Sequence, residues 1–142
     1  MFKKIDFDTI KADDVLPQLN RLVSQDKINK WADVVGDHNP LHVDPEYAKQ
    51  TKFRVTIAHG PLVISFISEM MCNWLGPGWI EGGKLQDVRF RAPVKSGDEI
   101  TIRGKVMDKR IVDGIKMIEC EIYVENQQGE RVVEGRAIGN IE

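Results

Sequence analysis

Two of the three histidines in this 142-residue chain lie in one short segment, Gly36-Asp37-His38-Asn39-Pro40-Leu41-His42. Aspartate is an anion near neutral pH and histidine exchanges a proton there, so Asp37 is a candidate base and His42 a candidate acid or second base. Together they could orient one water molecule. The amide of Asn39 both donates and accepts hydrogen bonds, and could position that water or a catalytic group. The segment therefore indicates acid–base chemistry on a bound water.

A second feature with chemical potential is the pair Gly60-Pro61, which opens a long apolar segment. Because Pro61 has no N–H, the Gly60 amide at the start of a helix is left to donate a hydrogen bond, and the helix dipole strengthens that bond. Glycine also lacks a Cβ, which lets a ligand approach its backbone closely. Gly60 is therefore a candidate for stabilising negative charge on a substrate oxygen.

Plainer interpretations of these residues stay open at this point. Asp37 could simply end a helix or form a turn. His38 and His42 lie four residues apart, as metal ligands on one helix face do, but Pro40 between them would break that helix, so no metal site is expected. His38 is expected to face solvent, and His59 to be a structural histidine with satisfied hydrogen bonds.

The helices that must position these residues follow from hydrophobic periodicity. Ser24 is a good N-cap, and apolar residues at helical spacing predict a helix from there to Gly36. A proline then prevents the helix from continuing, so residues 37–42 are expected to form a loop. A short helix is expected over residues 44–49 and a long one over residues 62–75. The long helix is apolar on nearly every face, which predicts that the core wraps around it.

The second half of the chain changes to alternating apolar and polar residues, which is typical of strands with one buried face. Strands are expected near residues 83–92, 98–109, 115–125 and 130–139. Turn residues between them predict hairpins, with these strands as antiparallel neighbours. The last strand carries Gly135, Ala137 and Gly139 on one face, where small residues would let a helix approach the sheet closely.

Composition limits the class of protein. The 20 Lys and Arg residues against 22 Asp and Glu give a net charge of −2, so neither a nucleic acid nor an anionic membrane surface is an expected partner. The length fits a single domain over residues 1–142. Cys72 and Cys120 are far apart and lack the spacing of a metal site, so both are expected to be reduced residues of a cytoplasmic protein.

Two segments have features that bear on secretion or membrane insertion. The first eight residues carry a charge every few positions, which is not the pattern of a signal peptide. Between Val55 and Ile80 the only charged side chain is Glu69, but Gly60-Pro61 and Gly76-Pro77-Gly78 interrupt the apolar run. A helix buried in a protein core is therefore expected there, not a membrane span.

The segment from Gly36 to His42 resembles the signature Gly-Asp-x-Asn-Pro-x-His of the MaoC-like (R)-specific enoyl-CoA hydratases and dehydratases, and Asp44 and Ala48 agree with the extended pattern. Ala58-His59-Gly60 is similar to the entry into the central helix of that family, where Met usually stands in place of Pro61. The resemblance implies an α+β protein, a single hot dog domain in which a curved antiparallel sheet wraps around a long central helix.

The same resemblance implies an enzyme, a hydro-lyase that reversibly adds water to a trans-2-enoyl thioester and gives an (R)-3-hydroxyacyl thioester. Asp37 and His42 would then move the protons, and the Gly60 N–H would stabilise charge on the thioester oxygen. Ser68 matches a serine that supports the catalytic pair by hydrogen bonding. The sequence leaves open how the two proton transfers are divided between Asp37 and His42.

Substrate-binding residues are the least defined part of this prediction. Met71, Trp74 and Trp79 are either ordinary core or part of an acyl pocket, and Arg89 either contacts substrate phosphates or belongs to a solvated sheet face. The expected partners are an acyl-CoA or acyl-carrier-protein thioester and a second copy of the chain, as a homodimer or dimer of dimers. No cofactor is expected. The alternatives are a hot dog thioesterase and a non-catalytic module that binds acyl thioesters.

Overall fold

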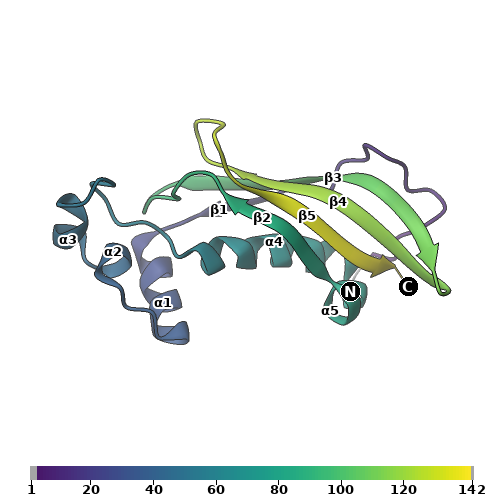
Figure 1. The fold of residues 1–142 in the computed structure, drawn as a ribbon, viewed down its shortest axis with the longest axis horizontal. Coiled ribbons are helices and arrows are strands. Elements are labelled where there is room, and N and C mark those ends of the chain that lie inside the picture. Colours follow the sequence, from purple (N-terminus) through teal and green to yellow (C-terminus); the bar gives the residue numbers. More distant parts are fainter. Residues whose placement is uncertain (1–2, 142) are drawn as a thin grey trace.

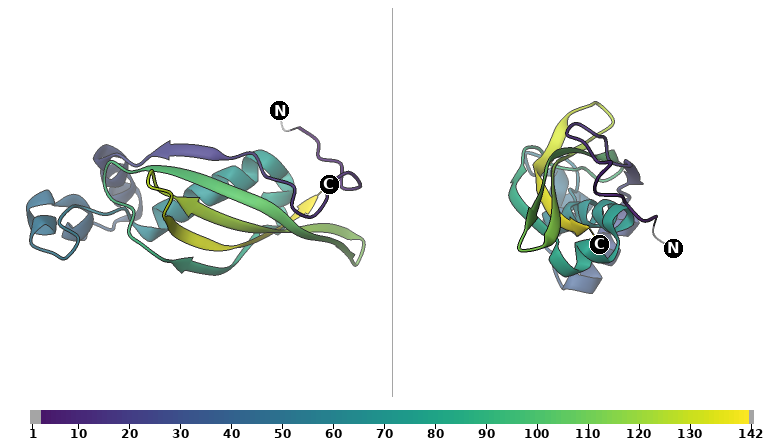
Figure 2. Two further views of the ribbon diagram at one scale, coloured as in Figure 1. Left: turned by 90° about the horizontal axis from the view of Figure 1, so that it is seen from above. Right: turned by 90° about the vertical axis from the view of Figure 1, so that its right-hand side faces the viewer.

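The computed structural model describes residues 3–141, and five strands and five helices lie within them. In chain order these are β1 (Leu19–Leu22), α1 (Gln25–Val35), α2 (Pro40–Val43), α3 (Pro45–Lys49), α4 (Gly60–Leu75), α5 (Pro77–Gly82), β2 (Lys84–Phe90), β3 (Glu99–Val112), β4 (Ile115–Glu125) and β5 (Arg131–Ile141). The strands form one antiparallel sheet that curves over α4 (Figures 1 and 2). This is the predicted α+β hot dog architecture.

The order of strands in the sheet is β1-β3-β4-β5-β2. Hairpins join β3 to β4 and β4 to β5, as predicted, with Gly114 and Gly129 at positive φ in the two turns. The prediction that all four strands are neighbours in chain order is wrong for β2, which pairs with β5 and not with β3. Two tight hairpins leave only the outer edges of β3 and β5 unpaired, so β1 and β2 occupy those edges.

Helix α4 fills the concave side of the sheet. Seven of its sixteen residues are buried, among them Ile67 and Met71, and they pack in one core with the inward-facing residues of β3, β4 and β5. Burial of a large apolar side chain stabilises a fold by roughly 1.5–3 kcal/mol, so this helix accounts for much of the core. A Cβ added to Gly139 on β5 would lie 2.4 Å from Cδ1 of Leu75 on the helix. The small residue therefore permits close contact between helix and sheet, as expected.

Three helices gather beyond one end of the sheet, away from both termini (Figure 1). The Ser24 hydroxyl caps α1 and the helix ends at Gly36, as the sequence predicted; Gly36 adopts the left-handed conformation. The expected loop over residues 37–42 is partly wrong, because α2 begins at Pro40. Proline is well suited to the first position of a helix, and Oδ1 of Asn39 accepts a hydrogen bond from the Leu41 amide at 3.0 Å.

Strand β1 and helix α5 were not expected from the sequence. Strand β1 has only four residues and occupies an edge, so its alternation is too short to recognise. Helix α5 begins with Pro77 and Gly78, which usually interrupt helices, but Pro77 stands in the first turn where it is tolerated. A Cβ at Gly78 would lie 2.1 Å from the carbonyl oxygen of Asn140, so this glycine lets α5 contact β5.

The apolar run from Val55 to Ile80 folds as α4 and the start of α5. Within residues 3–141, no helix combines the length and the apolar character that crossing a membrane requires.

Candidate active site

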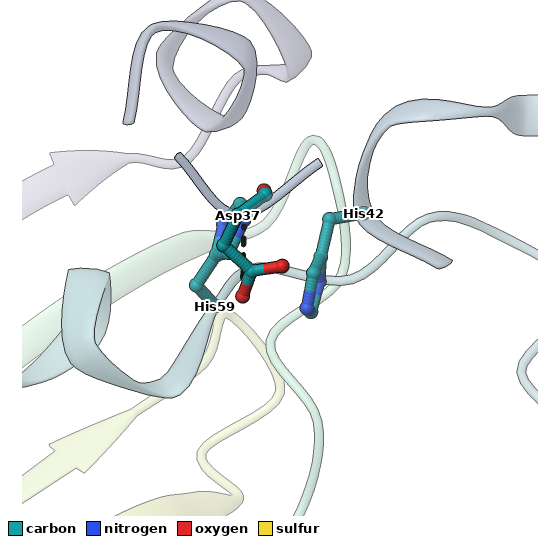
Figure 3. A group of neighbouring side chains, drawn as sticks. All are labelled: Asp37, His42 and His59. Atoms are coloured by element: carbon teal, nitrogen blue, oxygen red, sulfur yellow. Dashed lines mark hydrogen bonds and ion pairs between the residues drawn. The ribbon is translucent and has the colours of Figure 1, made fainter. Parts of the chain in front are cut away.

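Asp37, His42 and His59 meet where the end of α1, the start of α2 and the N-terminus of α4 come together (Figure 3). One potential ligand atom from each side chain lies within 4.8 Å of the others. The rings of His42 and His59 are stacked, with 3.9 Å between centroids and 28° between planes. His59 is 17 residues from His42 and 22 from Asp37 in the chain. The packing of three helix ends thus holds the three side chains in one cluster.

The hydrogen bond of His42 fixes its tautomer. Nδ1 of His42 lies 2.7 Å from the carbonyl oxygen of Ile57. A carbonyl oxygen only accepts hydrogen bonds, so Nδ1 carries the ring proton. In the neutral ring Nε2 then has a free lone pair. His42 can therefore take a proton from a water molecule through Nε2 and return it.

Asp37 provides the anionic member of the cluster. Its side chain is 52% exposed, and Oδ1 accepts a hydrogen bond from the backbone amide of Asn39 at 3.2 Å. The carboxylate is thus held by the backbone that follows it and keeps contact with solvent. Asn39 itself was predicted to position water or a catalytic group, but its Oδ1 caps α2. The residue therefore acts on the short helix that carries His42.

His59 is a member of this cluster that the sequence reasoning assigned to structure alone. Its side chain is 2% exposed, and Nε2 donates to the carbonyl oxygen of Asp37 at 2.9 Å. Nδ1 is buried without a hydrogen-bond partner among the described residues, so the prediction of a fully satisfied histidine is wrong for that atom. The sequence carried one indication that His59 belongs to the cluster. His59 directly precedes Gly60 at the start of α4, so the packing of that helix also fixes the position of His59.

Gly60 is the first residue of α4, where a helix leaves its amides without internal partners. Together with His42 it lines a cleft of about 450 Å³ whose other walls are mainly apolar, including Phe53, Val63 and Phe90. A Cβ on Gly60 would lie 2.9 Å from Cε1 of Phe90, so the backbone here is open only because the residue is glycine. The cleft thus presents a polar end, formed by His42 and Gly60, to an apolar interior.

Several residues predicted to serve the site have other positions. Oγ of Ser68 accepts a hydrogen bond from Nε1 of Trp79 at 2.9 Å, and within residues 3–141 it forms no hydrogen bond to Asp37 or His42. Met71 is fully buried in the core, and Trp79 packs beside Gly83. Trp74 borders a separate depression near the N-terminal segment. None of these side chains lines the cleft beside His42.

Arg89, the fourth predicted substrate-binding residue, is exposed on β2 and is likewise absent from the walls of the cleft. The neighbouring Arg91 does border the cleft, and it forms an ion pair with Glu134 on β5. Arg91 directly follows the last residue of β2, where the chain lies beside the cleft.

The cluster also contains the atoms that a metal ion would require, and the geometry does not favour one. Nδ1 of His42 and Nε2 of His59 both donate to carbonyl oxygens, which leaves Nε2 of His42 and Nδ1 of His59 as the nitrogens that could bind an ion. The rings face each other across their planes, whereas a metal ion binds a histidine nitrogen within the plane of its ring. The arrangement thus fits proton transfer better than metal binding.

The fold and the site together define a hot dog protein with an Asp–His acid–base pair at the mouth of an apolar cleft. Comparison with known families agrees. The MaoC like domain model matches residues 6–128, and the chain belongs to this family.

Individual relatives point the same way. The chain is 38% identical over 99 residues to an (R)-specific enoyl-CoA hydratase of Rhodospirillum rubrum, covering 66% of this chain and 67% of that one. It is 33% identical over 122 residues to the (R)-specific enoyl-CoA hydratase of Aeromonas caviae, covering 85% and 88%. The solved structure of R-hydratase PhaJ1 from Pseudomonas aeruginosa superposes with a TM-score of 0.84 at 29% identity, covering 98% and 87%. Alignments to two other curated relatives span 57% and 52% of their length.

Proposed function

We propose that the chain is a hydratase and dehydratase of acyl thioesters, which adds water to a trans-2-enoyl-CoA and forms the (R)-3-hydroxyacyl-CoA. The observation that carries this proposal is the shared cleft. His42, with Nε2 free to accept a proton, and Gly60, at the start of α4, line the same apolar space, and the Asp37 carboxylate lies beside them. Hydratases or dehydratases are named among the relatives.

The reaction follows from these positions. Asp37 and His42 hold a water molecule and take one proton from it while its oxygen attacks C3 of the enoyl group. The pair then delivers one proton to C2, which completes the addition. Negative charge that develops on the thioester oxygen is stabilised by the Gly60 N–H and the N-terminal end of the α4 dipole. The reverse sequence removes water from the 3-hydroxyacyl thioester.

The finer proposal concerns the assembly and its setting. We propose that the chain works as a homodimer in the cytoplasm and accepts CoA thioesters, with acyl-carrier-protein thioesters as a second possible substrate. An exposed aromatic ring on the rim of the cleft supports the dimer, because Phe90 is 55% exposed in the single chain. A second copy would cover such a surface.

Incubation of the purified protein with crotonyl-CoA tests the proposed function. Loss of the enoyl ultraviolet absorbance without release of free thiol is the expected result. Release of thiol would identify a thioesterase, and binding without either change would identify an acyl-thioester-binding module. A negative result across enoyl-CoA substrates of different chain length and with an acyl-carrier-protein thioester would reject the hydratase assignment.

A further inference from the structure

Gln25, the first residue of α1, forms side-chain hydrogen bonds in three directions. Its Nε2 donates to the carbonyl oxygen of His42 at 2.8 Å and to Oδ1 of Asn29 at 2.9 Å. Its Oε1 accepts from the hydroxyl group of Thr56. Thr56 is 2% exposed and Gln25 is half-buried, and the proposed chemistry uses neither of them. These bonds are therefore contacts whose purpose the proposed reaction leaves unexplained.

The contact with Thr56 connects Gln25 to the group that holds the His42 ring. Thr56 directly precedes Ile57, whose carbonyl oxygen accepts from Nδ1 of His42 at 2.7 Å. The Thr56 backbone is itself fixed, since its carbonyl oxygen accepts from the Ser96 amide at 2.9 Å. One amide side chain thus joins the backbone of His42 to the segment that sets the tautomer of its ring.

We propose that Gln25 and Thr56 are positioning residues that form a clamp on His42. The inference rests on the proposed function, in which His42 must offer Nε2 as a proton acceptor. Without the clamp, α2 and the segment at Ile57 are joined by the single backbone bond from the Ile57 amide to the Leu41 carbonyl oxygen, 3.3 Å long, and the Ile57 carbonyl is held less firmly against Nδ1. The ring then also populates the tautomer in which Nε2 carries the proton, and in that tautomer it cannot take a proton from water.

A purely structural role for Gln25 makes a different prediction, and Ser24 provides the matched control. The Ser24 hydroxyl caps the same first turn of α1 by accepting from the Lys27 amide at 3.1 Å. Ser24→Ala therefore weakens the start of the helix without removing a contact to His42. Loss of activity that exceeds this control is specific to the clamp.

The test compares the kinetics of crotonyl-CoA hydration and the ¹⁵N chemical shifts of the His42 ring. Gln25→Leu and Thr56→Val remove the hydrogen-bonding groups at similar volume, whereas Thr56→Ser keeps the hydroxyl. We expect kcat to fall about 10- to 100-fold in the first two variants, as for a displaced catalytic group, with KM changed less than about twofold. Their His42 shifts should move from the Nδ1–H form towards a mixture of tautomers. Thr56→Ser and Ser24→Ala should resemble the wild type in both measurements.

Gln25→Glu extends the test if Gln25→Leu does not fold. A glutamate keeps an acceptor for the Thr56 hydroxyl, but as a carboxylate it cannot donate to the His42 carbonyl. It should lose kcat in the same way. The double variant Gln25→Leu/Thr56→Val should be no slower than the slower single variant, because both substitutions break the same connection.

The outcomes separate the clamp from the proposed function. If the wild type hydrates crotonyl-CoA while the Gln25 and Thr56 variants keep its kcat and its His42 tautomer, the clamp is overturned and the function stands. An equal loss in Ser24→Ala also overturns the clamp. If the wild type hydrates no enoyl thioester, the proposed function fails, and the tautomer of His42 in the variants decides the clamp alone.

Discussion

The two stacked histidines at the site have contrasting surroundings. His42 is partly exposed at the cleft, and a carbonyl oxygen holds its Nδ1 proton. His59 is buried and gives its Nε2 proton to the backbone of Asp37. The first ring can exchange protons with a substrate or water, whereas the second ties the backbone of Asp37 to the start of α4. Identical side chains therefore serve different purposes because their hydrogen bonds and exposure differ.

Substitution of the proposed acid–base pair should abolish most of the activity. Asp37→Asn keeps the size of the side chain and an oxygen for the Asn39 amide, and His42→Ala removes the imidazole. We expect each to lower kcat by at least about a hundredfold, which is the usual contribution of a general acid or base. Hydration of crotonyl-CoA measures the effect. His38→Ala is the matched control, because His38 is exposed and its partner among residues 3–141 is Asp33 on α1. Near-normal rates in both site variants would contradict the assignment.

Gly60→Ala should impair the site without unfolding the protein. The new Cβ would lie 2.9 Å from Cε1 of Phe90, whose ring is half-exposed and can move away. The methyl group would still stand between substrate and backbone amide, so we expect kcat/KM to fall at least about tenfold. The thermal melting temperature should change little. Recovery of activity in Gly60→Ala/Phe90→Leu would show that the clash with Phe90, and not access to the amide, causes the loss.

The two cysteines should differ sharply in reactivity. Burial, and in second place the charge of Glu119, raise the pKa of the Cys120 thiol from 9.0 to about 12. Between pH 9 and 12 the Cys120 thiol therefore stays protonated in the folded protein, whereas the same thiol ionises in the unfolded chain. The contribution of the thiol to the stability of the fold is complete below pH 9 and is lost as the pH rises towards 12. At pH 9 iodoacetamide should label the partly exposed Cys72 first and Cys120 only on unfolding. Equal labelling rates in the folded protein would refute this.

At the level of elements, the close contact between α4 and β5 depends on the absence of a side chain at Gly139. Gly139 leaves space for Leu75, and a Cβ there would approach Cδ1 of Leu75 to 2.4 Å. Gly139→Ala should therefore lower the free energy of unfolding by about 1–3 kcal/mol, as overpacking of a core does, and Gly139→Val should lower it further. Urea denaturation measures both.

Leu75→Ala provides the internal control for this contact. It leaves a space in the core and is destabilising alone, but in Gly139→Ala/Leu75→Ala the two changes should compensate in part. Strictly additive losses would show that Gly139 is needed for another reason, such as its contact with Trp79.

For the whole molecule, we expect a homodimer. The cleft is open at Phe90, and α5 carries a second exposed apolar residue, Ile80, which is 74% exposed. Light scattering coupled to size-exclusion chromatography should give twice the 16.1 kDa mass of the chain, or four times it for a dimer of dimers. Phe90→Asp should shift the mass towards the monomer if the rim of the cleft lies in the interface. A monomeric wild type with full hydratase activity would show that one chain completes the site.

The sequence predicted the chemistry of the site better than its surroundings. The spacing of Asp37 and His42 and the glycine at the start of α4 were visible in the chain, and the family match confirms the hydratase and dehydratase class to which they pointed. Ser68 was assigned to the site from resemblance, and Met71 and the tryptophans were left open between ordinary core and an acyl pocket. Their real neighbours depend on how α4 is rotated against the sheet and α5, and a one-dimensional pattern does not give that rotation.

Local signals were sufficient to predict the longer helices and strands, but not β1, α2 and α5. The Ser24 cap, the end of α1 at Gly36 and the alternation in β3 and β4 depend on neighbouring residues, and the structure confirms each of them. Only the tertiary structure decided that β2 pairs with β5 and that His59 stacks on His42. Such contacts join residues far apart in the chain. They depend on which edges and faces remain available once the core has packed, so no short segment specifies them.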